Sequence, residues 1–297
     1  MNKINTHTST KPCERIYPDI SYVNTLSLGR KRFWILYVDE FTKFKWSNFV
    51  EKRSDFIPVT VSRIRELLYN NFKPRYLRLD NSGENIKLKN ELTSNFNYPD
   101  ISNITIEFTA PHTPQQNGVV ERRFAYLYDK VRSMINRAGL TLNLRELFWE
   151  ECFNMDTQLD NILVKNKHCN DELLYKRKPK VWRELHGFGE ICICSNLSTM
   201  SSKIKNKGEL AMMVGFSYNH PSLTYRLFKF KTKSIIHSRD IVWLNKYYSE
   251  YFKSNVLYRN LMSQSIPLNE YSESEYNGFE GTSLIIPMER FNNDEFQ

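Results

Sequence analysis

Three acidic residues lie at the ends of segments that the sequence pattern marks as strands or a helix. Asp80 follows the strand-like segment 75–79, Asp39 ends the dense apolar run 31–39, and Glu121 begins an apolar-periodic segment. A carboxylate at the carboxyl end of a strand in an α/β sheet points at the crevice where ligands bind. Ligand sets made only of oxygen favour Mg²⁺ or Mn²⁺ over zinc. These acids therefore indicate a divalent-metal site, with Glu121 as one of its ligands.

The helix that would carry Glu121 is predicted by an apolar stripe with three- and four-residue spacing, the period of one helical face. Pro111 and Pro114 hold the approach extended, so the helix is expected to begin after Pro114. Gly118 lets the backbone come close to a partner, and the helix dipole favours an acidic side chain in the first turn. Glu121 lies beside the stripe, where a ligand can be held rigidly. The stripe consists of Val120, Phe124, Leu127, Val131, Met134, Ile135 and Ala138.

The remaining elements follow from apolar patterns and turn residues. Residues 31–39 and 44–50 are expected to form a hairpin, followed by a helix at 52–70, strands at 75–79 and 104–108, and a second long helix from Asn143 toward Ile162. Beyond a charged connection the period changes. Short β-like runs at 190–195, 209–217, 225–230 and 234–243 predict a small barrel or sheet.

Charge is distributed unevenly along the 297 residues, whose formal net charge is +9. Residues 251–297 hold seven acids against three bases and carry −4, so residues 1–250 carry +13. A basic body is an electrostatic footprint for a polyanion such as a phosphate backbone. The acidic end, rich in Ser, Asn and Glu, has the composition of a disordered tail.

The five cysteines are odd in number and scattered, so we expect no disulfide framework and a reducing compartment. Cys192 and Cys194 would share one face of a period-2 strand as small core residues. There is no apolar run long enough to span a bilayer and no signal peptide at the polar N-terminus. The sequence predicts a soluble intracellular protein.

The order of residues around two of the acids resembles a known family. Residues 113–122, TPQQNGVVER, look like the segment that holds the glutamate of the D,D,E catalytic core in integrases of copia-type LTR retrotransposons. Residues 80–84, DNSGE, are close to the family's Asp-Asn-Gly-Gly-Glu. Motifs at 188–189, 214–216, 225–227 and 238–242 resemble the small β domain that follows this core, so the resemblance covers about residues 15–245.

The resemblance implies an α/β fold with a ribonuclease H-like mixed sheet flanked by helices, then a small all-β barrel-like domain and a disordered acidic tail. It implies a flexible segment at 1–14, a catalytic core at 15–165, a charged linker at 166–185, the β domain at 186–248 and the tail at 249–297. The metal-binding catalytic residues would be Asp19, Asp80 and Glu121. Asp39 is the alternative to Asp19, and we favour it as a turn residue or a residue beside the site.

The implied activity is strand transfer, in which 3′ ends of element DNA attack target DNA. Two Mg²⁺ or Mn²⁺ ions would activate the attacking oxygen and stabilise the leaving one. Arg122 and Arg123, beside such a site, are expected to contact phosphates, and we assign Gln116 and Asn117 to DNA binding as well. The resemblance further implies double-stranded DNA as partner, a homo-oligomer, and action in the nucleus after a cytoplasmic particle stage, as a released or truncated piece of a polyprotein.

Two alternatives remain open. In the family the first aspartate stands in a His-x-Asp strand followed by Gly-Pro, whereas this chain has Tyr17 in place of the histidine and Tyr22-Val23 in place of Gly-Pro. Pro18 also removes a backbone donor from an expected central strand. These departures favour a decayed or domesticated remnant that binds DNA without cutting it. A ribonuclease of the same fold is the other alternative, because spacing alone does not separate the two chemistries.

Overall fold

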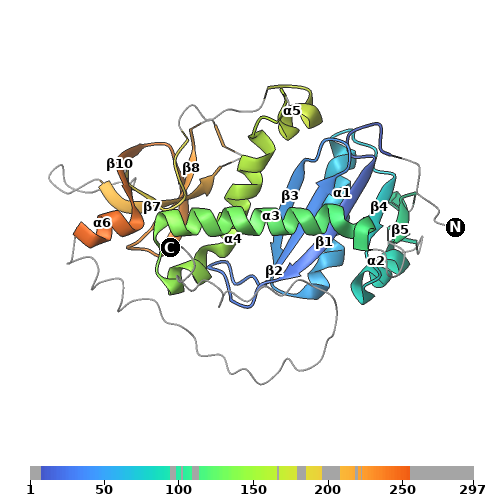
Figure 1. Cartoon of the computed structure of the whole chain (residues 1–297), viewed down its shortest axis with the longest axis horizontal. Helices are drawn as coiled ribbons and strands as arrows, with labels where there is room; N and C mark the ends of the chain where they lie inside the picture. The colour runs from blue at the N-terminus through green and yellow to red at the C-terminus, as the bar shows by residue number, and fades with distance from the viewer. Residues whose placement is uncertain are drawn as a thin grey trace, which may run out of the picture. The chain divides into compact units, whose positions relative to one another are not determined.

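The computed structural model describes two compact units of the chain, shown in Figure 1. The first holds the described residues up to Asp129 and those from Asp156 to 178, and the second holds Lys130–Met155 and the described residues from 185 to 254. Side chains at positions 93, 99, 114–119 and 121 lie outside the description. The described residues are 8–93, 98–101, 103–108, 114–165, 167–178, 185–195, 208–217, 220–221 and 223–254.

The first unit is built on a five-stranded mixed sheet with the order β3-β2-β1-β4-β5. Strand β1 is antiparallel to β2 and parallel to β4, β2 is antiparallel to β3, and β4 is parallel to β5. This is the predicted ribonuclease H-like sheet, and the predicted hairpin is β2–β3. The strands are β1 (Arg15–Tyr22), β2 (Phe33–Asp39), β3 (Lys45–Val50), β4 (Tyr76–Leu79) and β5 (Thr105–Phe108).

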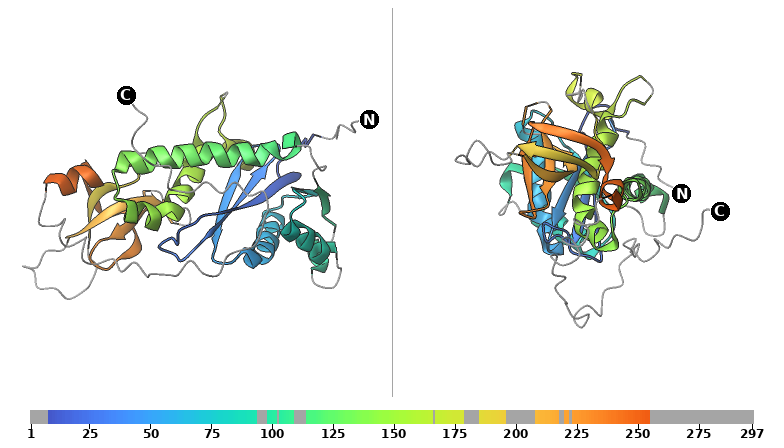
Figure 2. Two further views of the ribbon diagram at one scale, coloured as in Figure 1. Left: turned by 60° about the horizontal axis from the view of Figure 1, so that its bottom comes forward. Right: turned by 90° about the vertical axis from the view of Figure 1, so that its left-hand side faces the viewer.

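Helices cover both faces of this sheet (Figure 2). On one face, α1 (Phe56–Tyr69) and α2 (Gly83–Thr93) bury their apolar residues against the strands in a single core. On the other face, α3 (Pro114–Ala138) packs through Phe124 and Tyr128, whose rings lie 4.7 and 5.6 Å from that of Trp34 on β2. The sequence patterns predicted α1 and α3 but not α2. The short 3₁₀ turns are η1 (Arg53–Asp55) and η2 (Pro99–Ile101).

Pro18 is accommodated inside β1, which runs without a break through it. The backbone oxygen of Arg15 accepts a hydrogen bond from the Glu40 amide next to β2. Because the direction of backbone groups alternates along a strand, the even-numbered residues of β1 point toward β4. The ladder with β4 reaches only the pair Ile16–Leu77. The donor that proline lacks therefore faces a position beyond this ladder, which explains why a proline is tolerated in a central strand.

The free edge of β3 is covered by the end of α4 (Leu142–Ile162). The Asn161 side chain accepts a hydrogen bond from the Lys45 amide at 2.9 Å and donates one to the Lys45 carbonyl at 2.7 Å. The Lys45 ammonium pairs with the buried carboxylate of Asp160. Edge strands offer unpaired backbone groups to other chains. The two hydrogen bonds with Asn161 occupy the backbone groups of Lys45 and so block strand addition there. A short helix, α5 (Asn170–Tyr175), lies inside the predicted charged connection and was not predicted.

The second unit contains a five-stranded antiparallel sheet with the order β10-β6-β7-β8-β9. The terminal strands of this order, β9 and β10, do not pair with each other among the described residues, so the sheet is open and the barrel-like part of the prediction is corrected. Cys192 and Cys194 are fully buried, as predicted. The elements are β6 (Glu190–Ser195), β7 (Gly208–Phe216), β8 (Tyr225–Lys229), β9 (Ser234–Ser238), β10 (Ile241–Tyr247) and α6 (Tyr248–Ser254).

The compact units divide within α3 and α4, each of which contributes residues to both. The two units are defined by which residues pack together. They do not test the predicted domain limits along the sequence, 15–165 and 186–248, which stay a prediction. Ser9 and Cys13 are buried, and the expected flexibility of residues 1–14 stays a prediction. Residues 1–7 lie outside the description. Of the predicted tail at 249–297, residues 249–254 belong to α6 and residues 255–297 lie outside the description. All five cysteines are free thiols. In the described chain, no helix is long and apolar enough to cross a membrane.

Candidate functional site

Asp19 and Asp80 are brought to the same edge of the first sheet. The parallel strands β1 and β4 pair at Arg15–Tyr76 and Ile16–Leu77. Asp19 lies three residues beyond Ile16 on β1, and Asp80 lies three residues beyond Leu77, one residue after β4 ends. Both therefore lie past the paired part of the two strands, toward the same edge. Because side chains alternate between the two faces of a sheet, Asp19 is on the face that carries Arg15, and the same alternation continued past Leu79 sets Asp80 on the face of Tyr76. Both are partly exposed, so solvent ions can reach them.

Asp80 is held in place by the start of α2. Its Oδ1 accepts hydrogen bonds from the Ser82 amide at 3.0 Å and from the side-chain amide of Asn85, which is 3% exposed. A carboxylate that bonds the amide two residues ahead forms an Asx-turn, which suits the passage from a strand into a helix. Within the described part of the chain, Oδ2 of Asp80 accepts no hydrogen bond and is left for another partner. The role of Asn85 was missed, because nothing in its sequence context signals a buried amide.

Position 121 lies in the part of α3 that faces this sheet. Phe124 and Tyr128 follow it by three and seven residues, and such intervals bring residues to one side of a helix. Phe124 packs edge-on against Trp34, and the Tyr128 hydroxyl lies 3.0 Å from Oγ of Ser21, two residues beyond Asp19 on β1. These contacts place the backbone of Glu121 on the side of α3 that covers β1. Its side chain lies outside the described residues.

Asp39 has a structural role that occupies both of its carboxylate oxygens. Its Oδ1 accepts a hydrogen bond from the Cys13 amide at 2.9 Å, and its Oδ2 accepts bonds from the amide and hydroxyl of Thr42 at 2.8 and 2.6 Å. It is fully buried, and burial raises the pKa of its carboxyl despite these hydrogen bonds. Asp39 pairs with Ile16 in the sheet, so it points away from the face that carries Asp19. The structure thus supports the preference for Asp39 as a turn residue.

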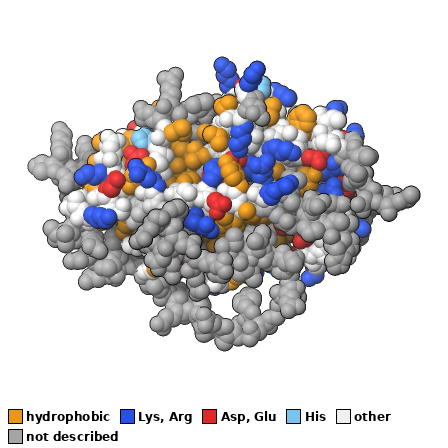
Figure 3. All heavy atoms as spheres, in the orientation of Figure 1, with side chains coloured by type: hydrophobic (Ala, Val, Ile, Leu, Met, Phe, Trp, Pro, Cys, Tyr) orange, Lys and Arg blue, Asp and Glu red, His pale blue; other side chains and the backbone are white. Residues whose placement is uncertain are grey.

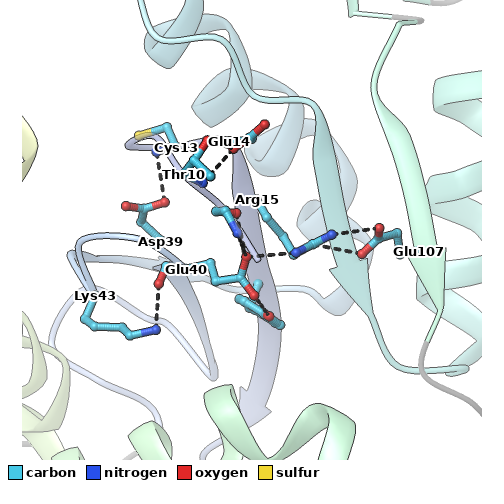
Figure 4. Close-up of polar contacts among 10 residues, drawn as sticks. Thr10, Cys13, Glu14, Arg15, Asp39, Glu40, Lys43 and Glu107 are labelled. Carbon is cyan, nitrogen blue, oxygen red and sulfur yellow. Dashed lines mark hydrogen bonds and ion pairs between the residues drawn. The ribbon is translucent and has the colours of Figure 1, made fainter. Parts of the chain in front are cut away.

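A buried polar network lies on the same sheet face as Asp19 and was not predicted (Figure 4). Arg15, 1% exposed, forms ion pairs with Glu40 and Glu107 at 2.8 and 2.9 Å. The Tyr17 hydroxyl donates to Oε1 of Glu40 at 2.7 Å. Tyr17 therefore anchors the turn after β2. Only the resemblance could have drawn attention to position 17, and it gave no partner for it.

The structure describes two of the four side chains that were predicted to bind DNA. Arg122 is exposed and Arg123 is half-buried, whereas the side chains of Gln116 and Asn117 lie outside the described residues. Basic side chains gather around α3 and α5 on the face shown in Figure 3. Exposed bases of the first unit on and beside these helices are Arg122, Lys165, Lys167, Lys176, Arg177 and Lys178.

The donor chemistry of the site fits a divalent cation. Among the side chains that the structure describes, no three acidic, histidine or cysteine groups meet as a metal site. Two described carboxylates, Asp19 on β1 and Asp80 immediately after β4, lie toward the same edge of the sheet, and the third predicted ligand is Glu121. Carboxylate oxygens without sulfur or imidazole suit Mg²⁺ or Mn²⁺, and the described geometry leaves Oδ2 of Asp80 available to one.

Comparison with known proteins identifies relatives of the chain. No protein-family model matches it. The chain is 26% identical over 217 residues to the retrovirus-related Pol polyprotein from transposon RE2 of Arabidopsis thaliana, an alignment that covers 71% of the chain and 14% of that relative. Its homologues are retrovirus-related Pol polyproteins. This confirms the predicted resemblance to copia-type transposons.

Two further Pol polyproteins are similar at the same level. Transposon RE1 of Arabidopsis thaliana is 26% identical over 214 residues, with 70% of the chain and 14% of the relative covered. Transposon TNT 1-94 of Nicotiana tabacum is 26% identical over 226 residues, with 73% and 16% covered. The chain thus spans about one seventh of the length of these relatives.

Comparison with solved structures finds a chain of the simian T-cell lymphotropic virus intasome, solved in complex with PP2A regulatory subunit B56 gamma. The two chains have a TM-score of 0.42 and 13% sequence identity, with 74% of each chain covered.

Proposed function

We propose that the chain is the integrase part of a copia-type Pol polyprotein and joins 3′ ends of element DNA to target DNA. The observation that supports the proposal is that Asp19 on β1 and Asp80, immediately after the neighbouring parallel strand β4, lie toward the same edge of a ribonuclease H-like sheet. Helix α3, which carries Glu121, packs on this sheet through Phe124. The Pol polyprotein homologues support an integrase-like role of the chain.

In this proposal, Asp19, Asp80 and Glu121 hold Mg²⁺ or Mn²⁺, and the bound ions supply Lewis-acid activation of the attacking and leaving oxygens. The described residues prepare the site. The Ser82 amide and Asn85 fix the Asp80 carboxylate in one orientation. Exposed Arg122 can bind a DNA phosphate from the first turns of α3. We further propose that the chain acts as a homo-oligomer on double-stranded DNA in the nucleus, since joining two DNA ends requires more than one active centre.

The test is Mg²⁺-dependent joining of a double-stranded oligonucleotide with an element end to a supercoiled plasmid. Wild-type chain is expected to give joined products, and both Asp80→Asn and Glu121→Gln are expected to reduce joining by at least about a thousandfold, because each removes a charge from the metal site. Asp39→Asn is the matched control, an aspartate at a strand end whose oxygens are already hydrogen-bonded.

Other outcomes are equally informative. DNA binding without joining by a folded wild-type chain would contradict strand transfer and favour the DNA-binding remnant. Cleavage of the RNA strand of an RNA–DNA hybrid, without joining, would favour a ribonuclease of the same fold. Equal activity of wild type and Asp80→Asn would contradict the acidic site itself.

A further inference from the structure

Arg15 spans three strands of the first sheet. Its Nε and Nη2 donate hydrogen bonds to the two carboxylate oxygens of Glu107 on β5 at 2.9 and 3.0 Å, and its Nη1 donates to Oε2 of Glu40 beside β2 at 2.8 Å. Its guanidinium carbon lies 5.0 Å from the ring centre of Tyr76 on the intervening strand β4. Figure 4 shows the side chain reaching from β1 to Glu107. One buried side chain therefore ties β1 to β5 and to the turn after β2.

Burying the charges of this cluster carries a desolvation cost in free energy. A buried ion pair must offset the desolvation of its charges, and apolar residues of similar size often give equal or greater stability. Burial lowers the pKa of Arg15, but the hydrogen bonds to Glu107 and Glu40 raise it by more, so the guanidinium stays charged. A planar guanidinium that binds both oxygens of a carboxylate also fixes their relative orientation. The cluster thus specifies geometry between strands.

The geometry that it specifies concerns the edge of the sheet where the acids lie. In the parallel pair of β4 and β5, Leu79 is level with Phe108, so Asp80 and the end of β5 reach the same edge. Glu107 is the residue before the end of β5. Strand β4 lies between β1 and β5. The pairing of Arg15 with Glu107 therefore holds β1 and β5 on either side of the strand that Asp80 follows.

We propose that Arg15 is a positioning residue for the acidic site, which binds Glu107 across β4 so that Asp19 and Asp80 keep a fixed position relative to each other. The inference rests on the proposed function, because it concerns how these two acids come to share a metal ion. Arg15 itself lies four residues before Asp19 on β1, about 13 Å away along an extended strand. It acts through the backbone of β5 and not by touching the ion.

The test is calorimetric titration of the full chain with Mn²⁺. Arg15→Lys keeps the charge but loses the fork that binds both oxygens of Glu107. Glu107→Asp keeps the charge but shortens the carboxylate by one methylene. Each variant is expected to weaken Mn²⁺ binding about tenfold, the low end of the range for partners that orient metal ligands. Neither variant changes net charge, so a loss of affinity reports geometry.

The matched control is a second guanidinium–carboxylate fork in the same unit. Arg65 binds Asp100 through Nε at 2.7 Å and Nη2 at 3.0 Å, on the exposed surface between α1 and η2. Arg65→Lys and Asp100→Glu are expected to change Mn²⁺ affinity by less than about twofold, because the fork does not lie on the face of the acids. Circular dichroism of every variant at the titration temperature checks that it is folded.

The outcomes separate the two proposals. Wild-type Mn²⁺ affinity in folded Arg15→Lys and Glu107→Asp, with weaker binding in Asp80→Asn, would overturn the positioning role and leave the proposed function standing. Equal affinities of wild type and Asp80→Asn would instead overturn the metal site. The Arg65→Lys control could also lose as much Mn²⁺ affinity as Arg15→Lys. Loss of any guanidinium–carboxylate pair would then weaken binding, and the positioning role of Arg15 would be overturned.

Discussion

Glu40→Gln is expected to lower the stability of the chain most near neutral pH and least in acid. Glu40 accepts hydrogen bonds from the amide and hydroxyl of Ser9, from the Tyr17 hydroxyl and from Arg15. Burial alone would raise the pKa of its carboxyl, but these hydrogen bonds outweigh burial and lower the pKa from 4.5 to about 2. As the pH falls, the unfolded chain therefore binds a proton at this carboxyl before the folded chain does.

The magnitude follows from that difference in pKa. The Glu40 side chain is 15% exposed, so solvent screens the interaction only in part. The drop from 4.5 to about 2 corresponds to about 3 kcal/mol of unfolding free energy. The sign for a lowered carboxyl pKa is that this contribution is fully present above about pH 4.5 and is lost as the pH falls toward about 2. About 1 kcal/mol is lost by pH 4 and about 2 kcal/mol by pH 3.

The assay is urea unfolding of wild-type chain and Glu40→Gln at a series of pH values from neutral to about pH 3. The difference in unfolding free energy between the two proteins is expected to shrink by about 2 kcal/mol across this range. Glu66→Gln is the control, since Glu66 forms an exposed ion pair with Arg63 and is expected to show little change at any pH. A difference for Glu40→Gln that stays constant with pH would refute the reasoning.

Three further predictions concern the elements around the acids. Phe124→Ala should lower the free energy of unfolding by about 3 kcal/mol because it removes the ring that packs against Trp34. An unchanged free energy of unfolding in a urea titration would contradict the packing of α3. Asp39→Asn should cost about 2 kcal/mol through its hydrogen bonds to buried donors while Mn²⁺ affinity per folded molecule stays within twofold; a large loss of affinity would make Asp39 a ligand. Pro18→Ala should change stability by less than about 1 kcal/mol, since the restored amide faces a position beyond the β1–β4 ladder; a loss above about 2 kcal/mol in the same assay would contradict that placement.

Patterns with strong periodicity predicted most of the fold. The run ending at Asp39 and the stripe from Val120 to Ala138 appear as β2 and α3 within a few residues of the predicted bounds, because burial on one face leaves a regular apolar spacing. Helix α2 was missed, since its sequence, GENIKLKNELT, is polar on most sides and the turn residues before it suggested a loop. The sequence also could not tell an open second sheet from a closed barrel. Pairing between β9 and β10 would depend on long-range register and not on local pattern.

For the candidate site, the sequence indicated candidate acids but not the residues that contact them. Asp80 could be selected because it ends a strand and precedes a turn, whereas Asp19 needed the family resemblance. The Arg15–Glu107 pair joins residues far apart in sequence, and no local signal shows which carboxylate a given arginine will meet. Pro18 looked incompatible with a central strand because the sequence does not reveal toward which neighbour its backbone points.

The central claim is that Asp19, Asp80 and Glu121 share divalent ions at one edge of the sheet. It is tested most directly by anomalous diffraction from crystals of the chain grown or soaked with Mn²⁺. The account predicts an anomalous peak with oxygens of all three carboxylates within about 2.0–2.4 Å. A peak ligated by Asp39, or a fully occupied Mn²⁺ elsewhere with none between Asp19 and Asp80, would contradict it.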